Sequence, residues 1–299
     1  MSRKSLGRIF PGAKSRPPVR DFTAAYFWFG FRHRMIHMPI LPRSRHAPMR
    51  AEPLPDASVV RTAAFPNWTH PMSTLCSFVL VHGAFVDGSG WRQVHDILAE
   101  KGHEVLVTQH PTLSLDADVE VVGRSIAQAR YPVVLVGHSY GGAVISQAGN
   151  DPKVRSLVYV AAFVPDSGES VADLTANPPA EVTPPPIVAD DGWLSIDRDR
   201  FAETFSADIP AAEARFMAAS QAAWGGAAFS GVVAQAAWKT KPSHYVVATE
   251  DRMIPLFAQR QMAGRAGATA IEIPASHAVM ISRAAQVAEI IERAGQDIV

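Results

Sequence analysis

The chain has 299 residues, 47% of them hydrophobic, and its 28 basic residues balance its 28 acidic residues. This length and composition allow one full hydrophobic core in a single domain, with or without an inserted lid. Cys76 is the only cysteine, which excludes an internal disulfide and a cysteine-based metal site and fits a reducing, cytoplasmic location.

The zero net charge conceals two kinds of sequence that meet near residue 71. Residues 1–71 contain twelve Lys/Arg, three Asp/Glu and ten of the 23 prolines, whereas the remainder contains sixteen Lys/Arg and twenty-five Asp/Glu. No helical or strand period persists in the first part, and its apolar run over 22–31 is too short to span a bilayer. Arginines follow that run where an export signal would have small residues, so a cleaved signal is disfavoured.

We therefore expect residues 1–71 to form a basic, proline- and arginine-rich disordered extension, with Met72 as an alternative start of the chain. Aromatic residues among the arginines leave a nucleic-acid-binding arm open as an alternative. The favoured interpretation includes no nucleic-acid partner and no membrane association.

From residue 72 onward, strand-like and helix-like segments alternate. Apolar runs without gaps are typical of strands covered on both faces, and an amphipathic stripe that ends at Gly102 is typical of a helix. The predicted segments are a strand at 78–81, a helix at 91–101, a strand at 104–108, a helix at 118–130, and strands at 133–136 and 156–162. This alternation predicts a mostly parallel sheet flanked by helices.

The alternation stops near residue 165. Residues 165–241 are rich in alanine, proline and aromatic residues, with proline clusters at 178–179 and 184–186, and contain no strand of the earlier kind. We interpret them as a helical cap inserted over the carboxyl edge of the sheet, where open α/β sheets bind ligands. The aromatic residues expected to line a substrate pocket are Phe85, Trp193, Trp224 and Trp238.

The alternation then resumes and completes the predicted core. Its last elements are a strand at 244–249, a helix at 256–265, a strand at 270–273 and a closing helix from Ala284. The predicted domains are thus the extension 1–71, a core of 72–164 and 242–299, and a cap of 165–241. The sequence contains no internal repeat, no Walker-type phosphate loop and no G-x-G-x-x-G motif.

The segment 133–142 (VVLVGHSYGG) predicts a serine on a sharp turn between a strand and a helix. Gly137-His138-Ser139-Tyr140-Gly141 matches the G-x-S-x-G nucleophile elbow. In this turn the serine backbone is strained, so the residues two positions before and after it must lack a Cβ. The apolar strand before the motif and the helix after it make the match specific. Ser139 is therefore predicted to be a nucleophile above the sheet edge.

A serine at neutral pH needs a base within hydrogen-bond reach, and the base needs an orienting acid. In this arrangement the acid and then the base follow the serine along the chain, each at the end of a strand. Asp251 follows the penultimate predicted strand and His277 follows the last one, so we assign them as acid and base. Glu250 and Asp166 remain alternative acids because each also follows a strand.

The tetrahedral intermediate of acyl transfer carries an anion that two preorganised donors must stabilise. We assign these oxyanion donors to the backbone N–H groups of Tyr140 and Ala84, with Phe85 as the alternative to Ala84. His82 is expected to brace the loop that carries Ala84. His138 is expected to pack beneath the elbow, away from the pocket.

Four segments resemble the α/β-hydrolase group of plant methylesterases, which includes the salicylic-acid-binding esterase and the plant hydroxynitrile lyases. They are residues 78–90, the Gly-His-Ser-x-Gly-Gly elbow, Ala161-Ala162-Phe163-Val164-Pro165-Asp166-Ser167, and Thr249-Glu250-Asp251 with Ile254-Pro255. The resemblance covers about residues 76–295. It implies an α/β-hydrolase fold, a Ser139/Asp251/His277 triad, oxyanion donors at Ala84 and Tyr140, and no metal or cofactor.

Two positions separate esterases from lyases within this group. The lyases of the group that this chain resembles have His-Thr where this chain has His82-Gly83. They also have a lysine after the catalytic histidine, which holds cyanide. Ala278 stands at that place here and cannot supply the positive charge.

These observations favour a serine carboxylesterase that cleaves a small, largely apolar ester through an acyl-enzyme. Two alternatives stay open: a small-molecule-binding protein without turnover, and a lyase or C–C bond hydrolase of the same fold. The expected partner is a small-molecule ester, and a homodimer is compatible with the sequence.

Overall fold

The computed structural model describes residues 75–180 and 182–297, so the predicted extension over 1–71 and Met72 lie outside the described residues. Its main feature is a six-stranded sheet, in which every neighbouring pair of strands is parallel, with the order β2-β1-β3-β4-β8-β9. The strands are β1 (Ser77–Val81), β2 (Glu104–Val107), β3 (Val133–His138), β4 (Val154–Val160), β8 (Ser243–Ala248) and β9 (Thr269–Ile273).

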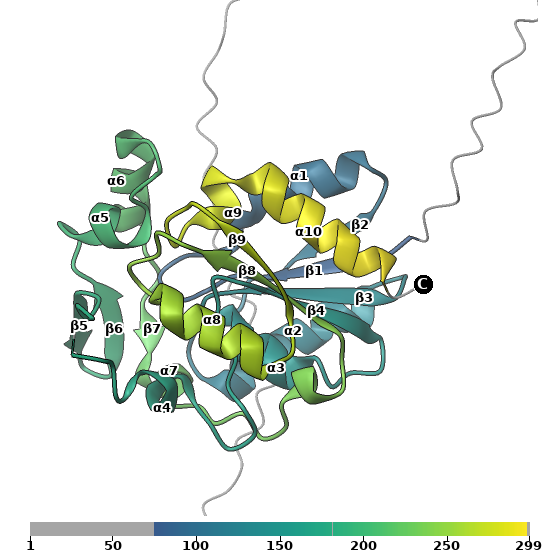
Figure 1. Ribbon diagram of the computed structural model, residues 1–299, viewed down its shortest axis with the longest axis horizontal. Coiled ribbons are helices and arrows are strands. Elements are labelled where there is room, and N and C mark those ends of the chain that lie inside the picture. Colours follow the sequence, from purple (N-terminus) through teal and green to yellow (C-terminus); the bar gives the residue numbers. More distant parts are fainter. Residues whose placement is uncertain (1–74, 181, 298–299) are drawn as a thin grey trace, which may run out of the picture. The chain divides into compact units, whose positions relative to one another are not determined.

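Helices cover both faces of this sheet (Figure 1). The helices outside the cap are η1 (Gly88–Trp91), α1 (Arg92–Glu100), α2 (Leu115–Gln128), α3 (Gly141–Ala148), α8 (Leu256–Arg265), α9 (Val279–Ser282) and α10 (Ala284–Gln296), and η2 (Ala237–Lys239) lies at the end of the cap. Buried residues of α1 and α10 belong to one core cluster, and those of α2, α3 and α8 belong to a second. The mostly parallel sheet flanked by helices, which the alternation of segments predicted, is confirmed.

The central strands supply both core clusters because successive side chains of a strand point to opposite faces. In β1, Phe78 and Leu80 pack in the cluster of α1 and α10, whereas Val79 and Val81 pack in the cluster of α2 and α3. All four side chains are fully buried. An uninterrupted apolar run is therefore required at this position in the fold, as predicted.

Local signals explain two of the helix boundaries. Helix α2 begins at Leu115, three residues before the predicted start, because the Ser114 hydroxyl caps it by accepting a hydrogen bond from the N–H of Ala117 at 3.3 Å. Gly102 after α1 has a φ of 87°, the left-handed conformation that commonly ends a helix.

The cap differs from the helical expectation because it also contains a small antiparallel sheet, with the order β5-β6-β7. Its elements are α4 (Val171–Thr175), β5 (Ile187–Asp190), β6 (Trp193–Ile196), α5 (Phe201–Phe205), α6 (Ala211–Ala219), β7 (Trp224–Gly225) and α7 (Gly226–Phe229). A two-residue turn, Asp191-Gly192, joins β5 to β6, and both residues have positive φ values (43° and 82°). Asp-Gly is a strong hairpin signal, and we did not use it in the sequence analysis.

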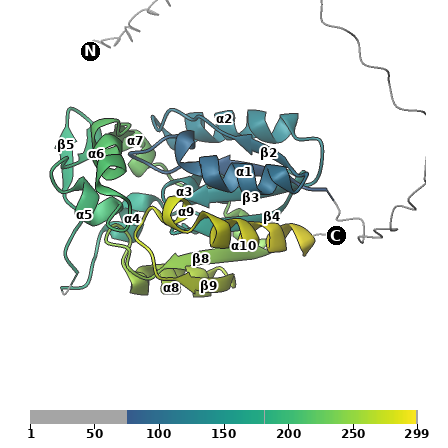
Figure 2. The same ribbon diagram turned by 90° about the horizontal axis from the view of Figure 1, so that it is seen from above.

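Figures 1 and 2 show the cap elements β5, β6, α5 and α6 gathered at one end of the main sheet. Backbone hydrogen bonds hold the cap there: Gly225 donates to the carbonyl of Thr112 at 2.8 Å, and Ala278 donates to the carbonyl of Phe205 at 3.1 Å. The cap thus has direct backbone contacts with the loops that follow β2 and β9.

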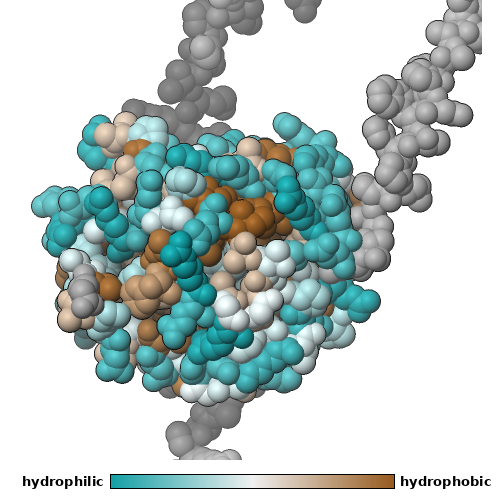
Figure 3. Space-filling model, in the orientation of Figure 1, coloured by the Kyte–Doolittle hydropathy of each residue, from teal (hydrophilic) through white to brown (hydrophobic). Residues whose placement is uncertain are grey.

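The face seen in Figure 3 is hydrophilic over most of its periphery, and apolar side chains gather near its centre. Among the described residues, Phe216 on α6 is the most exposed large apolar side chain, at 71%. No helix within residues 75–180 or 182–297 combines the length and the hydropathy that crossing a membrane requires.

Candidate active site

Ser139 lies at the turn between β3 and α3 with a φ of 53°, a strained conformation for a residue with a side chain. The two flanking glycines allow this turn. A Cβ on Gly137 would lie 2.5 Å from the carbonyl oxygen of Gly141, and a Cβ on Gly141 would lie 2.6 Å from that of His82. Both distances are too short for a side chain, so the steric role predicted for these glycines is confirmed.

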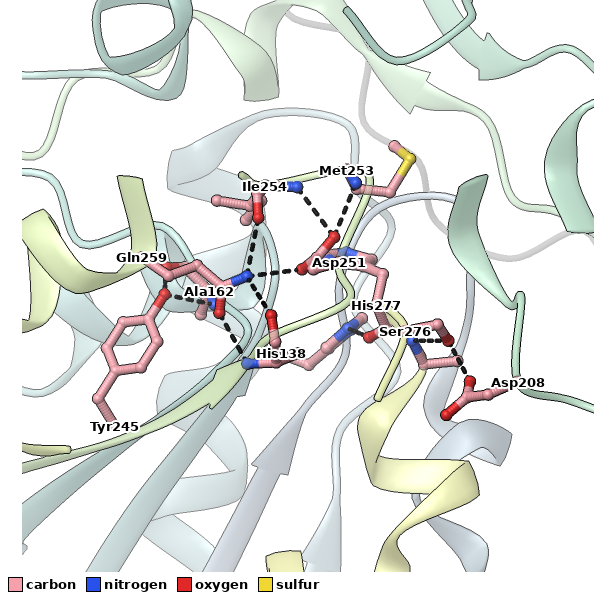
Figure 4. Close-up of polar contacts among 12 residues, drawn as sticks. His138, Ala162, Asp208, Tyr245, Asp251, Met253, Ile254, Gln259, Ser276 and His277 are labelled. Atoms are coloured by element: carbon pink, nitrogen blue, oxygen red, sulfur yellow. Dashed lines mark hydrogen bonds and ion pairs between the residues drawn. The ribbon is translucent and has the colours of Figure 1, made fainter. Parts of the chain in front are cut away.

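His277 and Asp251 form a buried pair near this elbow (Figure 4). The Nδ1 atom of His277 lies 2.7 Å from Oδ2 of Asp251, and the two residues are 1% and 8% exposed. The imidazole lies next to the elbow, because its ring centre is 4.7 Å from that of His138, the residue before Ser139. Its Nε2 is buried and has no hydrogen-bond partner among the described residues. That nitrogen can therefore accept a proton.

The Asp251 carboxylate accepts hydrogen bonds at both oxygens. The backbone N–H groups of Met253 and Ile254 donate to Oδ1 at 2.7 and 3.0 Å, and the Gln259 side chain donates to Oδ2 at 3.0 Å. Gln259 lies on α8, eight residues after Asp251, and no sequence motif marks it as a site residue.

The two alternative acids lie elsewhere. Glu250 is exposed, and Asp166 forms an ion pair at 2.6 Å with Lys239. The structure thus brings only Asp251, of these three carboxylates, to His277.

The segments on either side of His277 are attached to the cap. The Ser276 hydroxyl donates a short hydrogen bond to Asp208, which lies between α5 and α6 (Figure 4). Burial opposes ionisation of Asp208, but polar contacts that include the hydrogen bond from Ser276 outweigh it and hold its pKa below the ordinary value. The ring of Phe205 packs edge-on against His277, with ring centres 4.7 Å apart. These contacts were not anticipated from the sequence, because they join segments about 70 residues apart.

His138 is fully buried, and its Nε2 donates to the carbonyl oxygen of His277 at 2.9 Å. Burial and the neighbouring His277 imidazole lower its pKa well below the ordinary value. A neutral, hydrogen-bonded His138 is therefore part of the support of the His277 loop, in agreement with the packing role expected for it.

The loop after β1 runs against the elbow. A Cβ on Gly83 would lie 2.7 Å from the Cβ of Ser139, so only glycine allows this approach. The next residue, Ala84, and Ser139 line the same cavity, and Tyr140 lies directly before α3. The His82 imidazole donates from Nδ1 to the carbonyl of Gly83 at 2.9 Å, as expected for a residue that braces the loop. Burial, followed by the nearby His110, lowers the pKa of His82 to about 4.

A cavity of about 510 Å³ opens beside Ser139 between the sheet edge and the cap. Its wall is mainly apolar, and among the described residues Arg265 is the only charged one that lines it, paired with Glu169 at 2.9 Å. Residues at the wall that the sequence analysis did not assign to it include Phe163, Pro178, Pro179, Leu194 and Phe229.

Two of the four aromatic residues expected at the pocket are there and two are not. Phe85 and Trp224 line the cavity and meet edge-to-face, with ring centres 5.7 Å apart. Trp193 is a correction: it is 42% exposed, because the alternation of β6 places its neighbour Leu194 at the wall instead. Trp238 is the second correction, since its Nε1 donates to the carbonyl of Pro165 at 2.9 Å outside the cavity.

The parts of the chain that the structure describes contain no cluster of three or more His, Cys, Asp or Glu side chains suited to a metal ion.

The profile of the alpha/beta hydrolase family matches residues 78–290, and the chain belongs to this family. A carbendazim hydrolyzing esterase from Nocardioides sp. (strain SG-4G) is 39% identical over 114 residues, which are 33% of this chain and 47% of that protein. Methylesterase 2 from Arabidopsis thaliana is 28% identical over 140 residues, 42% of this chain and 51% of that protein. The chain thus spans about half the length of these curated relatives.

The fold has solved counterparts. A pyrethroid hydrolase from Sphingobium faniae JZ-2 superimposes with a TM-score of 0.65 at 24% identity, over 74% of this chain and 98% of that structure. The similarity to the plant methylesterase group, identified from four sequence segments, is confirmed by these relatives.

Proposed function

We propose that the protein is a serine hydrolase that cleaves a carboxylic ester through an acyl-enzyme. One observation carries this proposal: His277 pairs with Asp251 through Nδ1 and keeps Nε2 without a partner beside the strained elbow of Ser139. A nucleophile and a base that a third group orients are the parts that serine catalysis needs.

In the proposed first half-reaction, the Ser139 oxygen attacks the ester carbonyl while its proton moves to Nε2 of His277. The carbonyl oxygen becomes an oxyanion, which accepts hydrogen bonds from the N–H groups of Ala84 and Tyr140. The C–O bond to the alcohol then breaks, and the alcohol takes the proton from Nε2. Asp251 holds the imidazole in the tautomer that has its proton on Nδ1.

Water repeats these steps on the acyl-enzyme. Its oxygen attacks the acyl carbon, one of its protons moves to Nε2, and the bond to Ser139 breaks as that proton returns to the serine oxygen. The carboxylic acid leaves, and the free enzyme is restored.

The cavity supports an uncharged, mainly apolar ester. Its volume of about 510 Å³ lies within the 300–1,000 Å³ that is typical of sites for drug-sized ligands, so we extend the expected small ester to bulkier esters. Two names support the ester class: a carbendazim hydrolyzing esterase and a methylesterase.

A ligand-binding protein without turnover is the second candidate. A further relative, Salicylic acid-binding protein 2 from Nicotiana tabacum, is 31% identical over 105 residues and is named for the binding of a small molecule. The lyase alternative has less support, because the residue after His277 is the fully buried, uncharged Ala278.

The test is hydrolysis of p-nitrophenyl esters of increasing acyl length by the wild type and Ser139→Ala, together with labelling by a fluorophosphonate. We expect turnover that Ser139→Ala abolishes, and one phosphonate group on Ser139 by peptide mass spectrometry. Wild-type turnover in Ser139→Ala would refute the serine mechanism. Ligand-induced thermal shifts without any turnover would favour the binding protein.

The proposal also includes a cytoplasmic location, for which the single cysteine is the support. It keeps the division into a core of 72–164 and 242–299 and a cap of 165–241.

A further inference from the structure

A buried polar cluster lies behind the nucleophile elbow and takes no part in the reaction steps above. It consists of His82, His110, Asp118 and Tyr140, none of which is more than 4% exposed. They come from the end of β1, the segment after β2, helix α2 and the elbow. Burying four polar side chains is unfavourable unless they form hydrogen bonds or polar contacts with one another. A cluster of this kind is therefore a candidate for a functional role.

The contacts form a continuous chain from the elbow to the loop after β1. The Tyr140 hydroxyl donates to Oδ2 of Asp118 at 2.7 Å, and Oδ1 of Asp118 lies 3.3 Å from Nδ1 of His110, without hydrogen-bond alignment. The Nε2 atom of His110 donates to the carbonyl oxygen of His82 at 3.0 Å. The His82 and His110 rings also stack, with centres 3.8 Å apart and planes 6° from parallel.

The hydrogen bond to His82 fixes which nitrogen of His110 acts as the donor. Because a carbonyl oxygen only accepts, Nε2 of His110 must carry the proton of the bond to His82. The Nδ1 atom then faces Oδ1 of Asp118 at 3.3 Å, a close polar contact and not an aligned hydrogen bond.

The two ends of the chain are the two segments that carry the proposed oxyanion donors. Tyr140 provides one N–H itself, and the His82 carbonyl begins the His82-Gly83-Ala84 loop, which provides the other. The pairing of β1 with β3 ends at Val81 and Gly137, directly before both segments. Beyond that point the backbone pairing of β1 with β3 has ended, and the side-chain cluster connects the two segments.

We propose that Asp118 and His110 are positioning residues that set the spacing of the two oxyanion donors through Tyr140 and His82. This inference rests on the proposed function, since it concerns the anion of acyl transfer. The oxyanion develops in the transition state, so looser donors should lower kcat and leave KM nearly unchanged.

The first test compares Tyr140→Phe with Tyr159→Phe. Tyr159 is a matched control because it is also fully buried and its hydroxyl bonds to another side chain, Ser146, at 3.0 Å. The measurements are kcat and KM with p-nitrophenyl butyrate, Ki for a trifluoromethyl ketone that forms an anionic tetrahedral adduct, and Tm.

For Tyr140→Phe we expect kcat to fall about tenfold or more, the ketone to bind more weakly by a similar factor, and KM to change less than about twofold. For Tyr159→Phe we expect kcat within about twofold of the wild type, even if its Tm falls as much as that of Tyr140→Phe. Equal losses of kcat in both variants, or a loss confined to KM, would overturn the proposal.

Asp118→Asn and Asp118→Ala provide a second test that stands if Tyr140→Phe does not fold. Asparagine keeps an acceptor for the Tyr140 hydroxyl, so Asp118→Asn should retain kcat within about fivefold of the wild type. The kcat of Asp118→Ala should be about tenfold lower than that of Asp118→Asn. Equal activity of the two would contradict a positioning role.

The same experiments separate this inference from the proposed function. If the wild type hydrolyses no ester in a Ser139-dependent manner, the proposed function fails and this role fails with it. If the wild type is active and Tyr140→Phe keeps both kcat and ketone affinity, only the positioning role is wrong.

Discussion

The Gln259 amide nitrogen lies 3.0 Å from Oδ2 of Asp251, the same oxygen that lies 2.7 Å from Nδ1 of His277. Gln259 is fully buried, and its remaining bonds go to the backbone: both polar groups of Ala248 and the carbonyl of Ile254. One side chain therefore fixes the end of β8, the loop after it and the orientation of the carboxylate. The position of His277 depends on α8 through this link.

Replacing Gln259 should reduce both stability and turnover. Gln259→Met keeps the length of the side chain but leaves buried backbone groups unpaired, at a cost of about 1–3 kcal/mol, and it frees Asp251 to rotate. We expect kcat to fall about tenfold, measured with p-nitrophenyl butyrate alongside Tm. Gln221→Met is the matched control, since Gln221 bonds both backbone groups of Ile196 in the cap, at 2.8 and 2.9 Å. Similar losses of kcat in both variants would contradict a specific link to Asp251.

The identity of the acid can be tested by amide substitutions. Asp251→Asn should lower kcat by about 10³–10⁴, because an amide cannot hold the imidazole in the required tautomer. Glu250→Gln and Asp166→Asn should retain wild-type kcat, since neither carboxylate meets His277. Steady-state kinetics of the three variants would decide, and a large loss in Glu250→Gln with a small one in Asp251→Asn would move the assignment to Glu250.

The positions of the candidate site residues could be predicted because the fold brings the carboxyl ends of parallel strands to one edge. Ser139, Asp251 and His277 each follow a strand whose apolar run is visible in the sequence, so chain order gave their approximate places. Gln259, Asp118 and Asp208 could not be found in this way. They lie on or between helices, where a polar residue in the sequence is normally expected to face solvent. Only the packing of the folded chain shows that these residues are buried or paired.

The cap was the hardest part to predict, for a different physical reason. Its strands are short, and all of β5 and the first residue of β6 are exposed, so neither has the buried apolar run that marks the core strands. Asp191-Gly192 was the available signal of the hairpin. Even with the hairpin recognised, choosing between Trp193 and Leu194 as the wall residue requires the phase of β6, which only its packing against the core determines.

Two buried histidines should make the protein less stable in mild acid. His82, with a pKa of about 4, and His138, with a lowered pKa, stay neutral in the folded protein, whereas in the unfolded chain both bind protons below about pH 6.5. The unfolded state then binds more protons, so the free energy of unfolding falls as pH drops from 6.5 towards 4. The slope is at most about 1.4 kcal/mol per pH unit for each histidine.

Thermal unfolding of Ser139→Ala at pH values between 4 and 7 would measure this effect without turnover. The same scan on Ser139→Ala/His82→Asn should show a shallower fall, because one of the two groups is gone. A Tm that stays constant or rises as the pH is lowered through this window would contradict neutral burial of both imidazoles.

The two tryptophans of β6 and β7 should differ in their effect on ester specificity. Trp224 is 5% exposed, lines the cavity and packs against Phe85 and Tyr140, with ring centres 5.7 and 5.1 Å away. Trp224→Ala removes part of the wall, so we expect kcat/KM for p-nitrophenyl butyrate to fall about tenfold. Longer acyl chains should lose less, because they can fill the space that the indole leaves.

Trp193→Ala is the control because this side chain is 42% exposed outside the cavity. It should keep the wild-type order of preference among C2 to C12 acyl esters, whereas Trp224→Ala should shift that order towards longer chains. The profile of kcat/KM against acyl length tests both expectations, and Tm shows whether either variant is damaged more broadly. If Trp193→Ala changed the profile and Trp224→Ala did not, the cavity beside Ser139 would not be the acyl site.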